Sequence, residues 1–415
     1  MKQKSFFFQT VPNLNIELSH IDVVMKTKNT QFFIKFAVLL GFLLKNLCSY
    51  EYNKRSTMNN FKKIGLTALA GSLVTLGSAV AGEMSVSGSI STTLKMGKGN
   101  DNTGKSIGTD RDVTFSGGGE LDNGTTFSMS TTLDDTYAVS ASTTTITTPS
   151  MGSFAMGNST GSASYLYDEE VPQAYEQISD GKQSMANLIG NYMDNNVVMY
   201  TAPAMEFMGV GVQAHLGFSY QASDAGAADG GQATYSDTWG EGQEAGVTLT
   251  YDNLKVGVYG SERENKTAVG TGDAVRDEFN GVWYAKYNMG PISIGYSESY
   301  MDSGVTGSAE ATTTAKAERT AAGLYEGQQM SIAFNVNDNM SISYTTSEET
   351  YDSQDDAKTA VTTDDDTTEE IDAIQVAYSM GGMSIKAYSM DVTNPDQDED
   401  AADQSVTEIA LGFAF

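Results

Sequence analysis

The sequence predicts an all-β protein, a transmembrane antiparallel β-barrel of about sixteen strands. Three observations over residues 82–415 support this fold class. Segments of about ten residues alternate between apolar residues and small or polar ones, as strands with two different faces do. No apolar run approaches the roughly 18 residues that mark a spanning helix. The connections alternate between short turns and long polar loops, which is typical of outer-membrane barrels.

The composition excludes several classes of site. The chain has 415 residues, a formal net charge of -29, one cysteine (Cys48) and two histidines (His20 and His215). A single cysteine excludes an intramolecular disulfide and cysteine-based zinc or iron–sulfur sites. Two histidines argue against a histidine-rich metal site and a Ser-His-Asp triad, and the acidic balance argues against nucleic acid as a partner. Low mean hydropathy does not argue against a barrel, because its strands alternate.

The first 81 residues carry export signals. An apolar run over residues 32–44, interrupted by Lys35, is short for a spanning helix, which needs roughly 20 residues. A second start-like sequence begins at Met58. It has a basic region, then an apolar region over residues 66–76, and it ends in the small-x-small pattern of a signal-peptidase site at Ala81. We therefore expect a signal peptide over residues 58–81.

Three interpretations of residues 1–57 remain open. The preferred one is an upstream extension read from a misplaced start, because a three-part signal sits at an N-terminus. The others are an unusually long signal and an N-terminal anchor at residues 32–44. All three export residues 82–415, which we expect to form the barrel. Residues 1–81 hold 10 Lys and Arg and 3 Asp and Glu, so the exported part holds 14 and 50, with a net charge near -36.

The alternation places sixteen strands along residues 82–415. In the seventh, Val212, Ala214 and Leu216 alternate with Gln213 and His215. The expected strands are 84–96, 111–121, 125–133, 136–147, 152–157, 195–202, 209–220, 243–251, 254–262, 277–288, 291–301, 325–336, 339–349, 371–380, 383–391 and 405–415.

The lengths of the connections separate a barrel from a soluble sandwich, whose strands also alternate. Short turns such as Asp122-Asn123-Gly124 and Asn337-Asp338 interleave with long polar connections, with one fault at Asp134-Asp135, where a long loop is due. A sandwich has no reason to sort its loops in this way. An even strand number also places both chain ends on the periplasmic side.

The last strand carries a family resemblance. Its apolar residues recur at every second position up to the chain end, at Ile409, Leu411, Phe413 and Phe415. This pattern resembles the closing strand of bacterial outer-membrane barrels. In that family it is the signal read by the barrel-assembly machinery, so the resemblance implies that this machinery is a partner.

Three further stretches resemble the general diffusion porins of Gram-negative, especially proteobacterial, outer membranes. They are residues 115–127, 151–157 and 196–203. The resemblance implies a sixteen-stranded barrel in outer-membrane lipid, a homotrimer, and a water-filled pore narrowed by an inward-folded third loop. One residue departs from the family, because Met199 stands where a basic pore-lining residue is common.

The resemblance places the third loop, residues 158–194, in the lumen. This loop holds one basic residue, Lys182, and we expect five of its acids to form the pore constriction: Asp168, Glu169, Glu170, Glu176 and Asp180. By alternation four basic side chains face inward from the wall: Lys95, Lys255, Lys286 and Lys386. Acids facing a few lysines would create a transverse field, and the overall acidic balance indicates a preference for cations.

The loops over residues 350–370 and 392–404 are very acidic. Asp396, Asp398 and Asp400 are spaced like the start of an EF-hand, but Ala401 and Thr407 stand where that motif needs Gly and Glu. We expect no EF-hand and no required cofactor, with loose Ca²⁺ or Mg²⁺ binding by loop carboxylates as an open alternative. His215 is expected to face the lumen as a chance polar position.

The sequence therefore favours a passive channel for ions and small hydrophilic solutes. A substrate-specific porin and a structural or adhesive surface barrel are the alternatives. A barrel enzyme is disfavoured, because its usual Ser-His pair would need His215, the single histidine of residues 82–415.

Overall fold

The computed structural model describes residues 83–99, 104–158, 162–178, 193, 196–222, 239–266, 274–275, 277–302, 305–306, 324–352 and 367–415. The predicted upstream extension, the signal peptide and Asp180 lie outside these ranges. So does most of the acidic loop predicted at residues 350–370.

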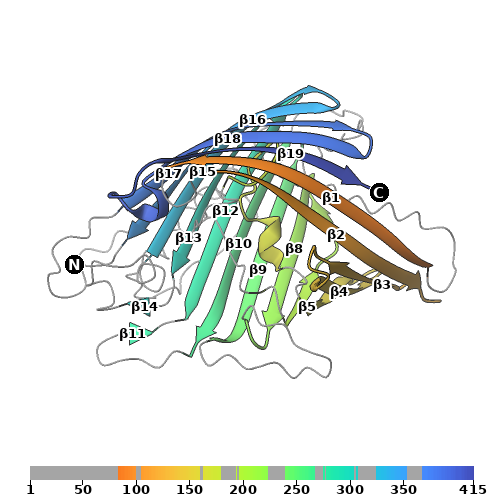
Figure 1. Cartoon of the computed structure of the whole chain (residues 1–415). Coiled ribbons are helices and arrows are strands. Elements are labelled where there is room, and N and C mark those ends of the chain that lie inside the picture. Colours follow the sequence, from red (N-terminus) through yellow and green to blue (C-terminus); the bar gives the residue numbers. More distant parts are fainter. Residues whose placement is uncertain are drawn as a thin grey trace, which may run out of the picture. The chain divides into compact units, whose positions relative to one another are not determined.

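Within the described residues, seventeen strands form one antiparallel sheet that closes on itself, because β1 pairs with β2 on one side and with β19 on the other (Figure 1). The strands of this sheet are β1 (Glu83–Lys98), β2 (Gly104–Glu120), β3 (Thr126–Leu133), β4 (Val139–Thr148), β5 (Gly152–Asn158), β6 (Val197–Thr201), β7 (Met205–Phe207), β8 (Val210–Ser219), β9 (Trp239–Tyr251), β10 (Leu254–Asn265), β12 (Glu278–Met289), β13 (Ile292–Asp302), β15 (Leu324–Asn337), β16 (Met340–Asp352), β17 (Thr367–Met380), β18 (Met383–Thr393) and β19 (Gln404–Ala414). A separate two-stranded sheet joins β11 (Ala274–Val275) and β14 (Val305–Thr306).

The closed sheet has sixteen strand positions, as predicted, because β6 and β7 together occupy one position. Both pair with β8, and the chain between them contains Pro203, which cannot donate a backbone hydrogen bond to the ladder. The strand bounds agree with the sequence prediction to within a few residues in most cases. β2 is the main exception, since it begins at Gly104 rather than at residue 111.

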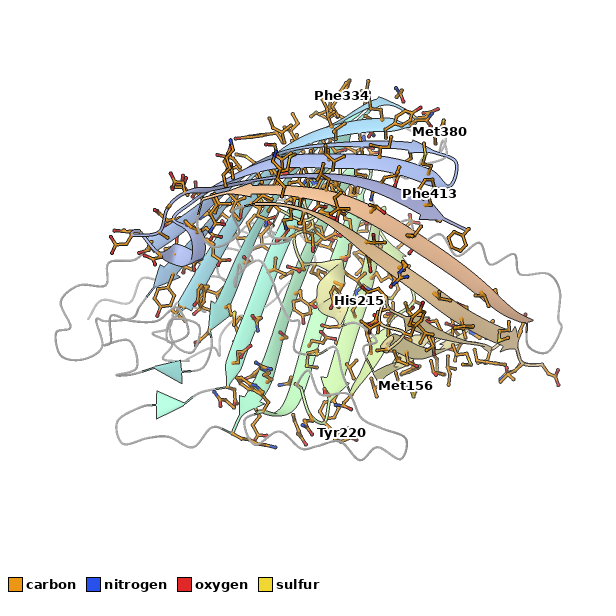
Figure 2. All side chains as sticks on the ribbon, viewed as in Figure 1. Met156, His215, Tyr220, Phe334, Met380 and Phe413 are labelled. Carbon is orange, nitrogen blue, oxygen red and sulfur yellow. The ribbon has the colours of Figure 1, made fainter. Side chains whose placement is uncertain are left out.

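The alternation along each strand separates an outer apolar face from an inner polar one. On β15 the outward side chains Met330, Ile332 and Phe334 are exposed, whereas the inward Gln329 and Ser331 are buried. Figure 2 shows Phe334, Met380 and Phe413 projecting from the outside of the wall. A closed barrel that exposes its large apolar residues is stable only where lipid covers them, so the protein is a multi-pass β-barrel of the outer membrane.

The predicted closing strand is confirmed. β19 pairs with β18 and β1, and the Phe415 amide donates to the Gly88 carbonyl at 3.0 Å while the Gly88 amide donates to the Phe415 carbonyl at 2.8 Å. Ile409, Leu411 and Phe413 face outward together with Phe415. Their role as an assembly signal stays a prediction.

The exception in the loop pattern is a short connection between β3 and β4. There the Asp134 carboxylate accepts hydrogen bonds from the Thr136 amide at 2.8 Å, the Thr136 hydroxyl at 2.6 Å and the Ala138 amide at 3.0 Å. An aspartate that binds the amides two and four residues ahead closes a tight turn, so the chain needs no long loop at this point.

The structure contains little helix. The described residues include the 3₁₀ helices η2 (Ala163–Leu166) and η6 (Pro395–Gln397), and none of their helices has the length and apolar character to span a bilayer.

Candidate pore lining

The third loop lies against the inner face of the barrel. Its described part, residues 162–178 and here called the inner segment, begins at η2. The Ser162 hydroxyl and the Ala163 amide both donate to the Glu244 carboxylate of β9, the amide at 3.0 Å. The Tyr259 hydroxyl of β10 donates to the same carboxylate at 2.7 Å. Glu244 thus fixes the start of the segment on the inner face of the barrel, and the narrowing of the pore by the third loop stays a prediction.

Tyr167 fills the next position along the wall. Its hydroxyl is 2.7 Å from His215 Nδ1, and its ring stacks on Tyr259 with ring centres 5.4 Å apart. Burial raises the pKa of Tyr167 to about 12, so its phenol stays neutral at physiological pH. Gly246 allows this close approach, because a Cβ there would lie 2.4 Å from the Tyr167 ring. His215 faces inward as predicted and serves as a partner of Tyr167 (Figure 2).

Glu170 joins the inner segment to two of the predicted wall lysines. Its Oε2 atom is 3.4 Å from Lys255 Nζ and also forms an ion pair with Lys286 Nζ. Both ammonium groups also lie over the Tyr284 ring, 5.3 and 5.5 Å from its centre. The acid and the lysines are therefore paired on one side of the barrel rather than facing each other across the lumen.

Two wall serines then fix the middle of the segment. The Ser331 hydroxyl of β15 donates to the Pro172 carbonyl, and the Ala174 amide donates to the Ser343 hydroxyl of β16 at 2.9 Å. Proline has no amide hydrogen, so its backbone can form a hydrogen bond only through its carbonyl oxygen. These bonds carry the segment across β15 and β16.

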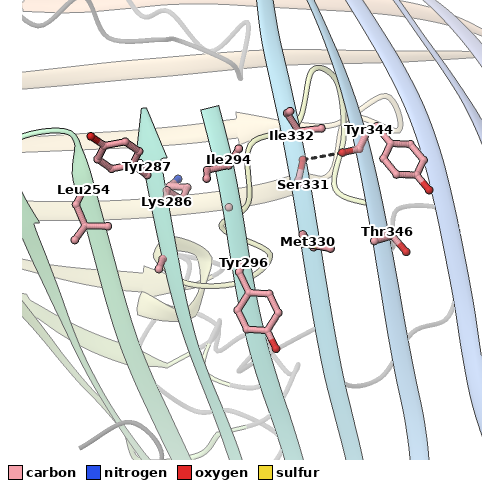
Figure 3. Close-up of a pocket in the computed structure, with 12 residues that line it drawn as sticks. Leu254, Lys286, Tyr287, Ile294, Tyr296, Met330, Ser331, Ile332, Tyr344 and Thr346 are labelled. Atoms are coloured by element: carbon pink, nitrogen blue, oxygen red, sulfur yellow. Dashed lines mark hydrogen bonds between the residues drawn. The ribbon is translucent and has the colours of Figure 1, made fainter. Parts of the chain in front are cut away.

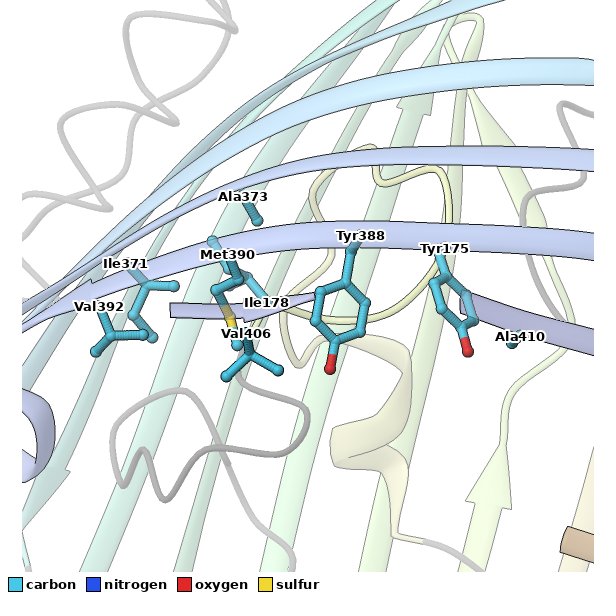
Figure 4. Packing of buried hydrophobic residues seen from close by; sticks show 9 residues of the cluster. All are labelled: Tyr175, Ile178, Ile371, Ala373, Tyr388, Met390, Val392, Val406 and Ala410. Atoms are coloured by element: carbon cyan, nitrogen blue, oxygen red, sulfur yellow. The ribbon is translucent and has the colours of Figure 1, made fainter. Parts of the chain in front are cut away.

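The far end of the segment is held by hydrogen bonds and by an apolar cluster. The Tyr175 amide donates to Gln375 Oε1 at 2.7 Å, and its hydroxyl donates to Glu408 Oε1 at 2.8 Å. Gln375 Nε2 in turn donates to the Glu176 carbonyl at 2.7 Å. Burial raises the pKa of Tyr175, so this phenol remains a donor. Figure 4 shows the cluster, in which Tyr175 and Ile178 pack on inward side chains of β17, β18 and β19: Ile371, Ala373, Tyr388, Met390, Val392, Val406 and Ala410.

The five predicted loop acids occupy different environments. Asp168 and Glu169 are 8% and 6% exposed, Glu170 is bound to two lysines, and Glu176 is half-buried. Asp180 lies outside the described residues. Their role in the constriction therefore stays a hypothesis, and the structure brings Glu170 into ion pairs with the predicted lysines Lys255 and Lys286.

The other two predicted lysines also face inward. The Lys386 ammonium lies 5.0 Å from the centre of the Tyr175 ring. Lys95 on β1 is the cross-strand partner of Glu408, an inner-face residue. Inward orientation, as alternation predicted, thus holds for all four wall lysines.

The wall formed by β1 to β4, here called the open sector, has a different inner face. None of the described residues between 83 and 154 is buried. Inward hydroxyls pair across the strands, with Thr114 and Thr132 joined at 2.8 Å. The hydrogen bonds given above for the inner segment all go to β8–β19, here called the covered sector, and none goes to the open sector.

Sequence reasoning missed two inward acids of the open sector. Asp110 and Asp112 on β2 are cross-strand partners of the inner-facing Ser91 and Ser89. Residues 97–110 were predicted to be a loop because glycine and polar residues dominate them and Ile107 is their one large apolar residue. The signal that could have found the acids is the alternation of Ile107, Thr109 and Arg111 with smaller or acidic residues.

The described residues include no group of three or more His, Cys, Asp or Glu side chains arranged to hold a metal ion. Asp398 and Asp400 of the acidic 392–404 loop are exposed, and the Asp398 carboxylate accepts the Asp400 amide at 3.0 Å.

Comparison with known proteins identifies the fold. No family model and no curated protein matches the chain. Among solved structures, the chain is similar to OmpT of Vibrio cholerae in a trimer form, with 14% identity, a TM-score of 0.53, and 81% of this chain and 100% of that chain covered.

Two further solved structures are similar to the same extent. One is the anion-selective porin of Comamonas acidovorans, with 11% identity, 80% and 100% coverage and a TM-score of 0.53. The other is OmpF of Salmonella typhi in complex with daunomycin, with 10% identity, 80% and 97% coverage and a TM-score of 0.53. At these identities the likeness establishes a porin fold.

Proposed function

We propose that the protein forms a water-filled channel for the passive diffusion of ions and small hydrophilic solutes across the outer membrane. The observation that carries this proposal is the unequal inner face of the closed barrel. The inner segment is bonded to the covered sector, whereas the open sector presents Ser, Thr and Asp side chains that remain accessible. The space between this polar wall and the anchored loop is a passage that water can fill.

A planar-bilayer recording of the purified protein tests the channel. We expect discrete, ohmic conductance steps in potassium chloride. A barrel that inserts in the correct orientation but conducts no ions would support a structural or adhesive protein instead. Conductance that one class of solute blocks at low concentration would favour a substrate-specific porin.

The sign of the selectivity is a separate proposal, because the fold does not determine it and one similar structure is an anion-selective porin. We propose a preference for cations. The exported part of the chain holds 50 acids against 14 bases, and fixed charge of one sign in a narrow passage enriches counter-ions. The loop acids Asp168, Glu169, Glu170, Glu176 and Asp180 remain candidates for this charge. The wall pair Asp110 and Asp112 joins them, because these two carboxylates face the open sector.

Two variants separate these sources. In one, the five loop acids are changed to Asn or Gln; in the other, Asp110→Asn is combined with Asp112→Asn. We expect the reversal potential in a potassium chloride gradient to move toward zero in both. Per carboxylate removed, the wall variant should move it further, because Glu170 is paired with Lys255 and Lys286 and Asp168 and Glu169 are buried. An anion-selective wild-type pore at low salt, where screening is weakest, would refute the preference.

We also propose a homotrimer that associates through the outer face of the open sector. Arg111 faces outward, in the same row of cross-strand partners as the apolar Ile90 and Phe413. An outward arginine in the bilayer costs about 2–4 kcal/mol at the midplane. Outward hydroxyls continue the patch across β3 and β4, where Thr131 and Ser142 are joined at 3.3 Å. The Arg111 guanidinium donates one hydrogen bond to the Asp135 carbonyl at 3.3 Å. A protein neighbour could pair with its other donors, whereas lipid could not.

Gel mobility of unheated samples tests the trimer. Ser142→Trp places a large ring in the proposed contact and should convert trimer to monomer. Ile374→Trp, at an exposed outward position on β17, is the matched control and should leave the trimer intact. Equal mobility of the two variants would show that this face is not the contact.

The exported form is proposed to begin at Gly82, after cleavage at Ala81. N-terminal sequencing of the protein from the outer membrane checks this directly. Finding residues 1–57 still attached would exclude the signal-peptide interpretation of residues 58–81.

A further inference from the structure

The first part of β2 has one unpaired edge in the open sector. β2 pairs with β1 from its first residue, Gly104, onward, but its pairing with β3 begins only at Val113, opposite Leu133. β3 ends there because the tight turn at Asp134 returns the chain to β4. Figure 1 shows β2 continuing past the end of the short strand β3, whereas the covered sector, part of which Figure 3 shows from close by, has long strands side by side. Among the described residues, the stretch 104–112, here called the free edge, therefore has a neighbouring strand on one side only.

The hydrogen-bond ladder assigns the backbone groups that point away from β1. Gly88 of β1 and Phe415 exchange both of their backbone hydrogen bonds. Successive residues of an antiparallel strand bond on opposite sides, so the even-numbered residues of β1 bond to β19 and the odd-numbered ones to β2. These odd-numbered residues face even-numbered residues of β2 without a register shift. The odd-numbered residues of the free edge therefore point their amides and carbonyls away from β1. They are Lys105, Ile107, Thr109 and Arg111.

Most of the free edge stands beyond the apolar band of the barrel. A strand tilted by about 40° rises about 2.5 Å per residue along the membrane normal. Thr109 is eleven residues from the end of β2 at Glu120, so it lies about 28 Å from that rim, and Lys105 lies about 38 Å from it. The apolar band of an outer-membrane barrel is about 25 Å tall. Residues 104–111 are all exposed, and the Ile107 side chain is 75% exposed. Water and other polypeptides therefore reach this edge.

The side chains of the free edge restrict which strand can join it. Its outward face carries Lys105 and Arg111 at the two ends, with Ile107 and Thr109 between them. Like charges directly opposite each other destabilise a strand pair, so the two bases reject a basic strand and protect the edge against non-specific pairing. A strand with carboxylates opposite Lys105 and Arg111 is attracted instead. On the inward face, the Asp110 carboxylate favours a partner whose residues there are uncharged.

We propose that the free edge binds an extended, acidic segment of another protein, which adds to the sheet as one further strand. The amides and carbonyls of the odd-numbered residues recur at every second position, and an extended polypeptide presents its own groups at the same spacing. A lipid chain or a compact solute has no groups at this spacing. Charge complementarity selects the segment, because its outward carboxylates meet Lys105 and Arg111. The barrel thus offers a protein-docking site beside the channel.

Fluorescence polarisation of a labelled peptide with the purified protein in detergent tests the proposal. The probe has seven residues, with glutamate at both ends, valine at the third and fifth positions and threonine at the other three. We expect saturable binding. The same peptide N-methylated at both valines keeps its charge but loses two donors to the edge, so it should bind about tenfold or more weakly. Equal affinity of the two peptides, or no saturable binding of the first, would overturn the proposal.

A proline variant tests the position of the edge. Thr109→Pro removes one amide on the side where the described residues place no neighbouring strand, so the sheet tolerates the ring. It should weaken binding of the unmodified peptide about tenfold, whereas the matched control Thr109→Val keeps the amide and should bind as the wild type does. If Thr109→Pro fails to fold, judged by gel mobility before and after heating, the methylated peptide on the wild type carries the test. A folded Thr109→Pro variant that binds the peptide unchanged, or that loses an oligomer which Thr109→Val keeps, would overturn the proposed site or its occupant.

Discussion

The open sector and the covered sector are built from the same kind of strand but differ in what their inner faces hold. In the open sector the inward residues are small or polar, such as Ser89, Thr114 and Thr143. In the covered sector large side chains face inward as well, among them Tyr259, Tyr284 and Met390. The large residues are those on which the inner segment packs.

One closed sheet can thus support the inner segment on one side and face water on the other. Large inward side chains remove apolar area from water only where a loop covers them, at roughly 25 cal/mol per Å². Small hydroxylated residues stay favourable in contact with water. The size of the inward residues therefore indicates on which side of a barrel an inward loop is anchored.

The largest expected effect is on the free energy of unfolding, and it distinguishes two arginines, one in each sector. Arg263 and Glu278 form a buried ion pair at 2.8 Å, and Arg263 also stacks on Trp239 at 3.4 Å. Arg263→Ala should lower the free energy of unfolding by about 3–5 kcal/mol, because it leaves a buried carboxylate without this partner. Arg111→Ala, in the open sector, should not lower the free energy of unfolding, because it removes an exposed outward charge that a bilayer or detergent solvates poorly. Urea unfolding in detergent measures both, and equal losses would remove this distinction between the sectors.

A smaller effect is expected where the inner segment is attached. Tyr175→Phe removes the hydrogen bond to Glu408, and bonds to charged groups contribute roughly 1.5–3 kcal/mol. Hydrogen exchange of the backbone around residue 175 should become about tenfold or more faster, while strand exchange stays unchanged. Tyr137→Phe, an exposed tyrosine of the β3–β4 connection, is the control. Unchanged exchange near residue 175 would mean that the apolar cluster and the Gln375 hydrogen bonds hold the segment without the Tyr175 hydroxyl.

The smallest effect is a pH response in the open sector. The hydrogen bond from the Thr136 hydroxyl lowers the pKa of Asp134. A lowered pKa in the folded state stabilises the turn above the unfolded pKa of about 3.9, and this contribution is lost as pH falls through the folded value. Amide chemical shifts of Thr136 and Ala138 should therefore change below about pH 4. Asp134→Asn keeps an acceptor without a titrating group, so shifts that still titrate in this variant would assign the response elsewhere.

Much of the fold could be predicted from the sequence, because alternation reports two-faced strands directly. The strand count, the closing strand ending at Phe415 and the inward lysines Lys255 and Lys286 all follow from periodicity. The start of β2 was missed because polar residues on both faces of Gly104–Asp110 resemble a loop. A strand with one neighbour and water around it needs no apolar residue to form.

The arrangement inside the barrel could not be predicted in the same way. The sequence set the loop acids against a few inward lysines without pairing particular residues, and in the structure Lys255 and Lys286 both bind Glu170. Periodicity gives the face of a strand on which a residue lies, but not which long-range partner reaches it. That partner depends on the path of the third loop across ten strands, which no local pattern contains.

The position of the water path is the central claim, and thiol modification during single-channel recording tests it most directly. Cys is introduced at Ser89 of the open sector or at Ser331, which is buried beneath Pro172. The single native cysteine, Cys48, precedes the proposed cleavage site at Ala81. An impermeant charged thiol reagent should change the conductance of the Ser89→Cys channel within seconds and leave the Ser331→Cys channel unchanged. Modification of the Ser331→Cys channel with an inert Ser89→Cys channel would place the water path on the opposite side and contradict the account.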